Sequence, residues 1–205
     1  ICIAFDEVPN ISRLGQCKNL QWLCPGYDVT DISFIGKCKN LCHLDLDESA
    51  VTDISALRKC TNLRTLYINN SGIEDISALG RCTNLQVLNL TESQVTDISA
   101  LGNCINLRKL ILECTEISNI SVLSKCTNLL KLDLGNLQIT DILVLGNCIN
   151  LQKLNLAGSQ VTDISVLRNC TDLRDLNLTG SQVTDISALR KCTNLRKLDL
   201  CETQV

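Results

Sequence analysis

Leucine and isoleucine recur along most of the chain in a fixed order, and the polar positions between them recur with the same period. The clearest marker is a cysteine that returns every 22 residues without a break: Cys38, Cys60, Cys82, Cys104, Cys126, Cys148, Cys170 and Cys192. One typical unit runs from Leu85 to Asn106. A fixed period of roughly 20–50 residues is the signature of a solenoid, in which no unit can bury its apolar face alone and stacked units share one core.

Each unit predicts one short strand and one helical turn. In Leu66-Tyr67-Ile68, apolar residues flank an outward position, which is the pattern of a strand with one buried face. After a polar turn, the segment Asp-Ile-Ser-x-Leu places two apolar residues three apart, which suits a single turn of 3₁₀ or α-helix behind a Thr-Asp cap. Nine strand segments are predicted, beginning at Leu20, Leu41, Leu63, Leu85, Leu107, Leu129, Leu151, Leu173 and Leu195.

Two recurring motifs resemble a known family. The segments Asp-Ile-x-x-Leu and Cys-Thr-Asn-Leu, as at Cys60 to Leu63, resemble the leucine-rich-repeat family, specifically the 22-residue class of the SDS22 phosphatase regulators and the bacterial internalins. The chain departs from that class in having Cys before Thr-Asn where the family has Leu. It also has Ser or Thr after the strand, at Ser93 and Thr115 for example, where the family has a buried Asn.

The resemblance implies an α/β leucine-rich-repeat solenoid. This is a curved right-handed superhelix with a parallel β-sheet on the concave face and short 3₁₀ or α turns on the convex face. We expect residues 1–19 to form an irregular N-terminal segment or partial cap. Residues 20–205 are expected to form an array of about nine strands with no evident C-terminal cap.

The 14 cysteines could indicate a metal site, disulfides or redox chemistry. Zinc is disfavoured because the chain has no Cys-x-x-Cys pair and a single histidine, His43. Disulfides between neighbouring units are within reach at a strand spacing of about 4.8 Å, but side chains in one column point in parallel. We therefore predict a stack of reduced thiols in the core that includes Cys17, with Cys24 and Cys201 facing outward.

Two polar columns have a structural explanation that competes with a functional one. A row of aspartates, with Asn119 in the place of one, could bind cations or could accept backbone N–H groups of the helical turns. The single asparagine favours the hydrogen-bonding role. An asparagine column that includes Asn62 and Asn106, with Asp172 at one position, is expected to bond backbone groups in neighbouring loops. No catalytic constellation, metal-binding spacing or phosphate loop is found, so neither catalysis nor a cofactor is expected.

Charge and thiol content bear on partners and compartment. The net charge is −3 without a like-charged block, which disfavours nucleic acid, and no apolar run approaches the ~20 residues of a membrane span. Residues 1–7 lack the basic start of a signal peptide. Many unpaired thiols, and glycosylation triplets such as those at Asn69, Asn89 and Asn177 on the strands, favour a cytoplasmic protein. A cell-surface or secreted location is the alternative.

Three outward-facing rows should cross the sheet. In each unit the first row holds the residue before the second Leu, the second row the residue after it, and the third row the residue after the third apolar position. Trp22, His43 and Tyr67 fall in these rows of an aromatic-poor chain, and aromatic residues often anchor interfaces. The predicted partner-binding residues are Trp22, His43, Asp45, Tyr67, Val87, Asn89, Lys109, Ile111, Lys131, Asp133, Lys153 and Asp175.

The sequence thus favours a scaffold that binds another protein on its concave sheet. Alternatives are an internalin-like surface recognition module, the repeat domain of a larger signalling or ubiquitin-ligase protein, and a spacer that stacks on itself through the open strand at Leu195–Leu200.

Overall fold

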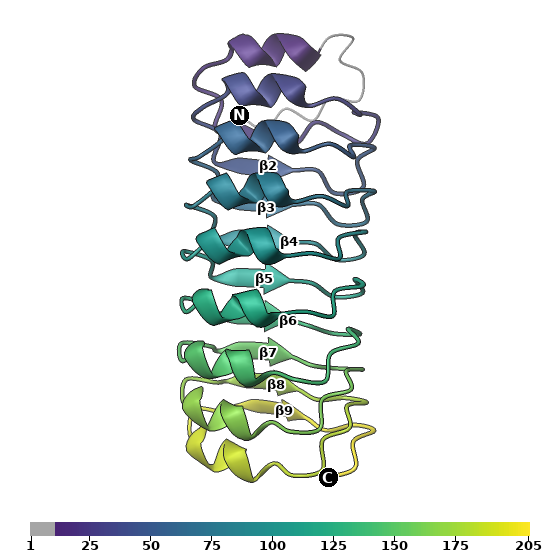
Figure 1. Ribbon diagram of the computed structural model, residues 1–205, viewed down its shortest axis with the longest axis vertical. Coiled ribbons are helices and arrows are strands. Elements are labelled where there is room, and N and C mark those ends of the chain that lie inside the picture. Colours follow the sequence, from purple (N-terminus) through teal and green to yellow (C-terminus); the bar gives the residue numbers. More distant parts are fainter. Residues whose placement is uncertain (1–10) are drawn as a thin grey trace.

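A computed structural model describes residues 11–205, so the prediction for residues 1–7 lies outside the described part of the chain. Nine strands form one parallel sheet in the order β1 to β9, and a 3₁₀ helix precedes each strand (Figure 1). The strands are β1 Trp22–Leu23, β2 His43–Asp45, β3 Thr65–Tyr67, β4 Val87–Asn89, β5 Lys109–Ile111, β6 Lys131–Asp133, β7 Lys153–Asn155, β8 Asp175–Asn177 and β9 Lys197–Asp199. The helices are η1 Ile11–Gln16, η2 Ser33–Lys37, η3 Ser55–Lys59, η4 Ser77–Arg81, η5 Ser99–Asn103, η6 Ser121–Lys125, η7 Leu143–Asn147, η8 Ser165–Asn169 and η9 Ser187–Lys191. The nine strands and the short 3₁₀ turns confirm the predicted solenoid.

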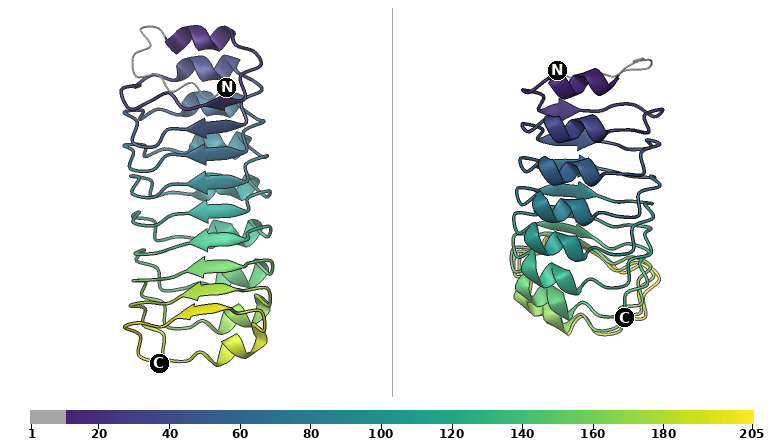
Figure 2. Two further views of the ribbon diagram at one scale, coloured as in Figure 1. Left: turned by 180° about the vertical axis from the view of Figure 1, so that it is seen from behind. Right: turned by 45° about the horizontal axis from the view of Figure 1, so that its top comes forward.

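The sheet and the helices form two layers of the stack. Figure 2 shows the strands on one side and the helical turns on the other, with the chain advancing along the stack by one unit per turn. Each strand pairs only with its sequence neighbours, and the register places equivalent residues opposite one another, as in Leu44↔Leu66 and Leu66↔Leu88. The sheet is therefore a ladder in which each of the three outward rows is continuous.

One hydrophobic core fills the space between the layers. Leu66, Ile68, Ile76 and Leu79 of a single unit are at most 1% exposed, and equivalent side chains repeat in the neighbouring units. Removing one such side chain, for example by Leu→Ala, typically costs about 2–5 kcal/mol. At the last unit this burial ends, because Leu198 of β9 is 36% exposed whereas its equivalent Leu176 is fully buried.

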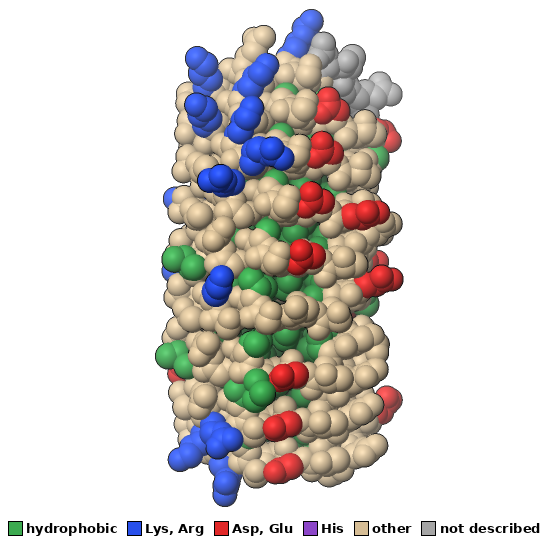
Figure 3. Space-filling model, viewed as in Figure 1, with side chains coloured by type: hydrophobic (Ala, Val, Ile, Leu, Met, Phe, Trp, Pro, Cys, Tyr) green, Lys and Arg blue, Asp and Glu red, His purple; other side chains and the backbone are tan. Residues whose placement is uncertain are grey.

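The helical turns are held at their start by the aspartate column. Asp53 Oδ1 accepts the backbone N–H of Ser55 at 2.7 Å, and Asp75 does the same for Ser77 at 2.7 Å. Each carboxylate therefore acts from two residues before the helix, across an intervening buried isoleucine such as Ile54, rather than from the residue immediately before it. Figure 3 shows these carboxylates as a stripe down the helix face.

The asparagine column ties successive loops together, as predicted. Asn62 Nδ2 donates to the carbonyl of Lys39 at 3.0 Å, and Asn106 Nδ2 donates to the carbonyl of Thr83 at 3.0 Å. Each bond spans 23 residues of sequence and so joins one unit to the one before it. The Ser/Thr column after the strands is buried, and it is only partly paired: Thr115 Oγ1 donates to Leu112, whereas the Ser93 hydroxyl has no hydrogen-bond partner among the described residues.

The predicted thiol stack is present in the core for eight units. Cys38 to Cys192 at the 22-residue spacing are buried, and the Cys82 and Cys104 thiols each lie 3.4 Å from a backbone carbonyl oxygen in the helical turn of the preceding unit. Burial raises the pKa of Cys82 and of Cys104 to about 12. The prediction was wrong for Cys17, which is exposed because it lies in the first described unit, at the end of the column.

Candidate functional site

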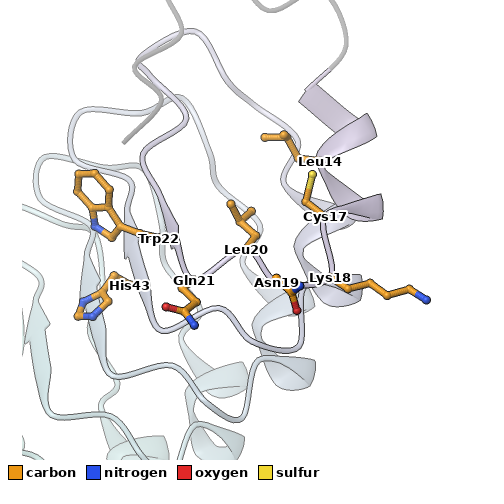
Figure 4. Close-up of a pocket in the computed structure, with 8 residues that line it drawn as sticks. All are labelled: Leu14, Cys17, Lys18, Asn19, Leu20, Gln21, Trp22 and His43. Carbon is orange, nitrogen blue, oxygen red and sulfur yellow. The ribbon is translucent and has the colours of Figure 1, made fainter. Parts of the chain in front are cut away.

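The first outward row is continuous from β1 to β9. Strand pairing joins Trp22 to His43, His43 to Thr65 and so on to Lys197, so the predicted row residues are neighbours in space. Figure 4 shows Trp22 and His43 side by side, projecting away from Leu14 and Cys17. Next to them a hollow of about 520 Å³ is lined by Leu14, Cys17, Lys18, Asn19, Leu20, Gln21, Trp22 and His43.

The middle of the first row is basic. Lys109, Lys131 and Lys153 lie opposite one another on β5, β6 and β7. The Lys153 ammonium lies 3.6 Å from Asp175 on β8, and within residues 11–205 this is the one ion pair closer than 4 Å. Lys109 and Lys131 are half-buried, and neither ammonium group has a described carboxylate within 4 Å.

The second row has a backbone role that the sequence interpretation missed. Asp45 Oδ1 accepts the N–H of Asp47 at 3.1 Å, and Asn89 Oδ1 accepts that of Thr91 at 3.2 Å. In four more units the second-row Oδ1 accepts the N–H of the residue two positions later: Asp133, Asn155, Asn177 and Asp199. A signal for it was available, since Asp or Asn recurs at this position in six of nine units.

Cys24, Tyr67 and Ile111 occupy the other three second-row positions, and Tyr67 and Ile111 are the two large side chains among them. Both are half-buried residues of the second row, and neither side chain carries a carboxylate or amide oxygen that could accept the strand-end N–H. At Tyr67 the neighbouring unit compensates, because Asp47 Oδ1 accepts the N–H of Asn69 at 2.9 Å and Asp47 Oδ2 accepts its amide at 2.8 Å. Val87 of β4 lies between them in the first row. Tyr67, Val87 and Ile111 together form an apolar patch at the centre of the sheet, called the apolar step.

Acidic groups flank this apolar step at either end. Burial raises the pKa of the Asp47 carboxyl, which the bonds from Asn69 oppose. In the third row of β5's unit, desolvation and the nearby Asp133 and Glu92 carboxylates raise the pKa of Glu113, and the Lys131 ammonium opposes that rise. The sheet face is therefore not uniformly charged: acidic groups lie near Tyr67 and beyond Ile111, and the lysines lie at the other edge.

The helix face offers a second, smaller apolar surface. Leu143 is 63% exposed at the position where most turns begin with Ser, and Ile105 and Ile149 are 54% and 56% exposed where most units have Thr. Hydrophobic side chains are visible among polar ones on this face (Figure 3). These residues are absent from the predicted site.

Other kinds of site receive no support from the described residues. Within residues 11–205 no group of three or more His, Cys, Asp or Glu side chains is placed to hold a metal ion. No helix in that range is long and apolar enough to cross a membrane.

Comparisons with known proteins agree on the family. A family profile described as leucine-rich repeats, two copies, matches residues 39–81, 61–103 and 149–191. A search of curated proteins finds no significant match.

Solved structures show the same fold. An internalin (InlF) from Listeria monocytogenes is 32% identical with a TM-score of 0.91, over 95% of this chain and 58% of the internalin. Internalin C2 from the same organism is 32% identical with a TM-score of 0.81, over 83% of this chain and 76% of its own. A plant peptide hormone receptor, RGFR1, solved in complex with RGF2, is 24% identical with a TM-score of 0.80, over 94% of this chain and 34% of the receptor.

The chain thus spans less than two thirds of the first of these internalins. The 22-residue period, the parallel ladder, the family profile and the 32% identity to internalins agree, and the chain belongs to the leucine-rich-repeat family.

Proposed function

We propose that this chain is a protein-binding scaffold whose partner docks on the concave sheet. The observation that carries the proposal is the departure of Tyr67 and Ile111 from the second-row pattern. Six units use that position to bond their own backbone, and these two units present a large half-buried side chain instead. An apolar side chain that is only half-buried, at a position where most units have a backbone acceptor, is explained by a partner that covers it.

The shape of the face supports a macromolecular partner. Nine strands at about 4.8 Å give a surface roughly 40 Å long. Small molecules are generally held in enclosed pockets that bury most of their surface. Within this face, the predicted residues from Trp22 to Asp175 lie in two adjacent rows, and we propose Tyr67, Val87 and Ile111 as the centre of the contact.

A test compares two double variants, one on the sheet face and one on the helix face. Tyr67→Ala/Ile111→Asn alters the sheet, whereas Leu143→Ser/Ile149→Thr restores the common residues on the helix face. Proteins that co-purify with the chain from its native source should be lost with the first variant and retained with the second. Retention on the sheet variant together with loss on the helix-face variant would place the binding surface on the convex side and refute the proposal.

A second candidate is a surface recognition module, which the likeness to internalins favours. The buried, unpaired thiols favour the cytoplasm instead. Mass spectrometry of protein from its native source, denatured without reductant, decides between them. Free thiols and unmodified Asn69, Asn89 and Asn177 support the cytoplasm, whereas disulfides or glycans support the cell surface.

Self-association is a third proposal. Leu198 of β9 is 36% exposed, and an edge strand with exposed backbone groups can pair with another chain. A Leu198→Lys variant should then remain monomeric at concentrations at which the unaltered chain associates in light scattering. An unaltered chain that is monomeric throughout would refute this proposal.

A further inference from the structure

The unpaired lysines and the apolar step lie side by side on the sheet. Ile111 of β5 is two residues from Lys109 on the same strand, and Lys131 of β6 lies directly opposite Lys109. Val87 of β4 lies opposite Lys109 on the other side. Since neighbouring strands are about 4.8 Å apart, all four side chains fall within reach of one docking segment.

The two cations lie opposite each other, and neither forms an ion pair closer than 4 Å with a described carboxylate. Like charges directly opposite on neighbouring strands repel each other. Asp175 is engaged with Lys153 at 3.6 Å, and Asp133 Oδ1 accepts the N–H of Gly135 at 3.1 Å and the Asn155 amide at 2.8 Å. Among the described residues no carboxylate lies within 4 Å of the Lys109 or Lys131 ammonium, and the exposed Arg108 adds a further cation at that edge.

The charges around the apolar step have a direction. Glu113 lies two residues beyond Ile111, about 13 Å from Lys109 along the strand at 3.3 Å per residue. The Lys131 ammonium is near enough to oppose the rise in the pKa of Glu113, but the two groups form no ion pair closer than 4 Å. A partner carboxylate is attracted at the Lys109 edge and repelled at the Glu113 edge. Complementary charge of this kind fixes the orientation of a partner more than it sets the affinity.

We infer that the partner presents an acidic segment, with carboxylates over Lys109 and Lys131 and an adjoining apolar side chain seated on Tyr67, Val87 and Ile111. This inference rests on the proposed function and names the partner's chemistry. The apolar side chain provides the buried contact, and the carboxylates neutralise the lysine pair and set the register.

The test uses a library of random twelve-residue peptides displayed on phage, selected against the whole chain. A matched pair of variants then separates the sources of binding. Lys109→Glu/Lys131→Glu reverses two charges on the sheet, and Lys59→Glu/Lys125→Glu reverses two exposed lysines on the helix face, in η3 and η6. Ile111→Asn removes the apolar side chain and supplies the second-row acceptor found in other units.

The expected peptides carry Asp or Glu next to Leu, Phe, Tyr or Trp. Their affinity, measured by fluorescence anisotropy of a synthetic copy, should fall about tenfold or more on the sheet double variant and on Ile111→Asn. The helix-face double variant should change it less than about twofold, and added salt should weaken binding. A second selection against Lys109→Glu/Lys131→Glu should yield basic peptides in place of acidic ones.

Each other outcome refutes the inference in a distinguishable way. If selected peptides lose affinity on Ile111→Asn but show no acidic preference and tolerate the lysine reversals, the sheet binds and the acidic partner is wrong. If no sheet variant changes binding, or no peptide is selected, the proposed function fails together with the inference.

Discussion

Asn119 accepts the backbone N–H of Ser121 on its Oδ1 at 2.9 Å, in the position where Asp53 accepts that of Ser55 at 2.7 Å. The helical turn therefore requires an acceptor there and tolerates the loss of the charge. The hydrogen bonds from Ser55, Ser77 and Ser165 lower the pKa of Asp53, Asp75 and Asp163 below the ordinary 3.8.

These lowered values predict how stability depends on pH. A carboxylate whose folded pKa is depressed stabilises the fold above its unfolded pKa, and that stabilisation is lost as the pH falls through the folded value. Stability should therefore fall as the pH drops below about 4. The triple variant Asp53→Asn/Asp75→Asn/Asp163→Asn should flatten this acid limb in urea midpoints measured between pH 2 and 7. An unchanged acid limb would show that other carboxylates control it.

The asparagine column predicts a stabilising substitution. Asp172 occupies one position of the column, but its side chain has no N–H to donate. Asn128 Nδ2, by contrast, donates to the carbonyl of Ile105, 23 residues earlier in the chain, at 2.9 Å. Asp172→Asn should let the new amide reach the carbonyl of Ile149 and raise the free energy of unfolding by about 0.5–1.5 kcal/mol. Asn106→Asp makes the reverse change at the column position before Asn128. It should lower the free energy of unfolding by a similar amount, measured in the same urea titration. Equal stability of all three proteins would mean that these exposed bonds are replaced by water at no cost.

Thiol reactivity should separate the cysteines by position. Desolvation raises the pKa of the buried Cys60 to about 11 and of Cys148 to about 12, and only the thiolate reacts with alkylating reagents. Brief iodoacetamide treatment of the native protein at pH 8 should modify the exposed Cys17 and Cys114 first, and the column thiols only after denaturant is added. Peptide mass spectrometry gives the order. Modification of Cys148 as early as Cys114 in the native protein would mean that the core opens locally.

The fold could be predicted from the sequence because every unit repeats the same core positions. Leu66, Leu88 and Leu110 are invariant in type and buried, so a single period predicted strands, register and layers together. End effects were not predictable from a period, which is why Cys17 was assigned to the core. The binding face is harder, because its residues are those that the core does not constrain.

The hydrogen bonds of the second row could not be predicted from the pattern of apolar and polar residues. Asp45 and Asn89 face outward, and an outward polar residue is compatible both with a partner and with solvent. Their bonds to the strand-end N–H groups depend on how the backbone turns after each strand, which the alternation of apolar residues does not describe. Once these bonds are known, Tyr67 and Ile111 stand out as exceptions rather than as two members of a variable row.

The turn after each strand predicts a gain from glycine. Cys114 has φ 56, in the left-handed region that costs a side chain roughly 1–2 kcal/mol, whereas the equivalent Gly158 and Gly180 have φ 66 and 65. Cys114→Gly should raise the free energy of unfolding by up to about 1 kcal/mol, and Cys114→Ala should leave it nearly unchanged. Gly158→Ala should be destabilising, since the added Cβ would lie 2.5 Å from Asn136 Oδ1. If Cys114→Gly is no more stable than Cys114→Ala, the left-handed conformation at this turn carries no strain.

Ile111→Asn tests whether the fold loses stability by keeping an apolar residue on its face. The new side chain can accept the N–H of Glu113, as Asn89 accepts that of Thr91 at 3.2 Å, so this variant should be about 0.5–1.5 kcal/mol more stable than Ile111→Ala. Asn89→Ile removes the existing bond and should cost a similar amount relative to Asn89→Ala. Urea unfolding of the four variants measures both differences. If Ile111→Asn is no more stable than Ile111→Ala, the second-row bonds contribute nothing to the fold, and the departure of Tyr67 and Ile111 from the pattern no longer argues for a partner.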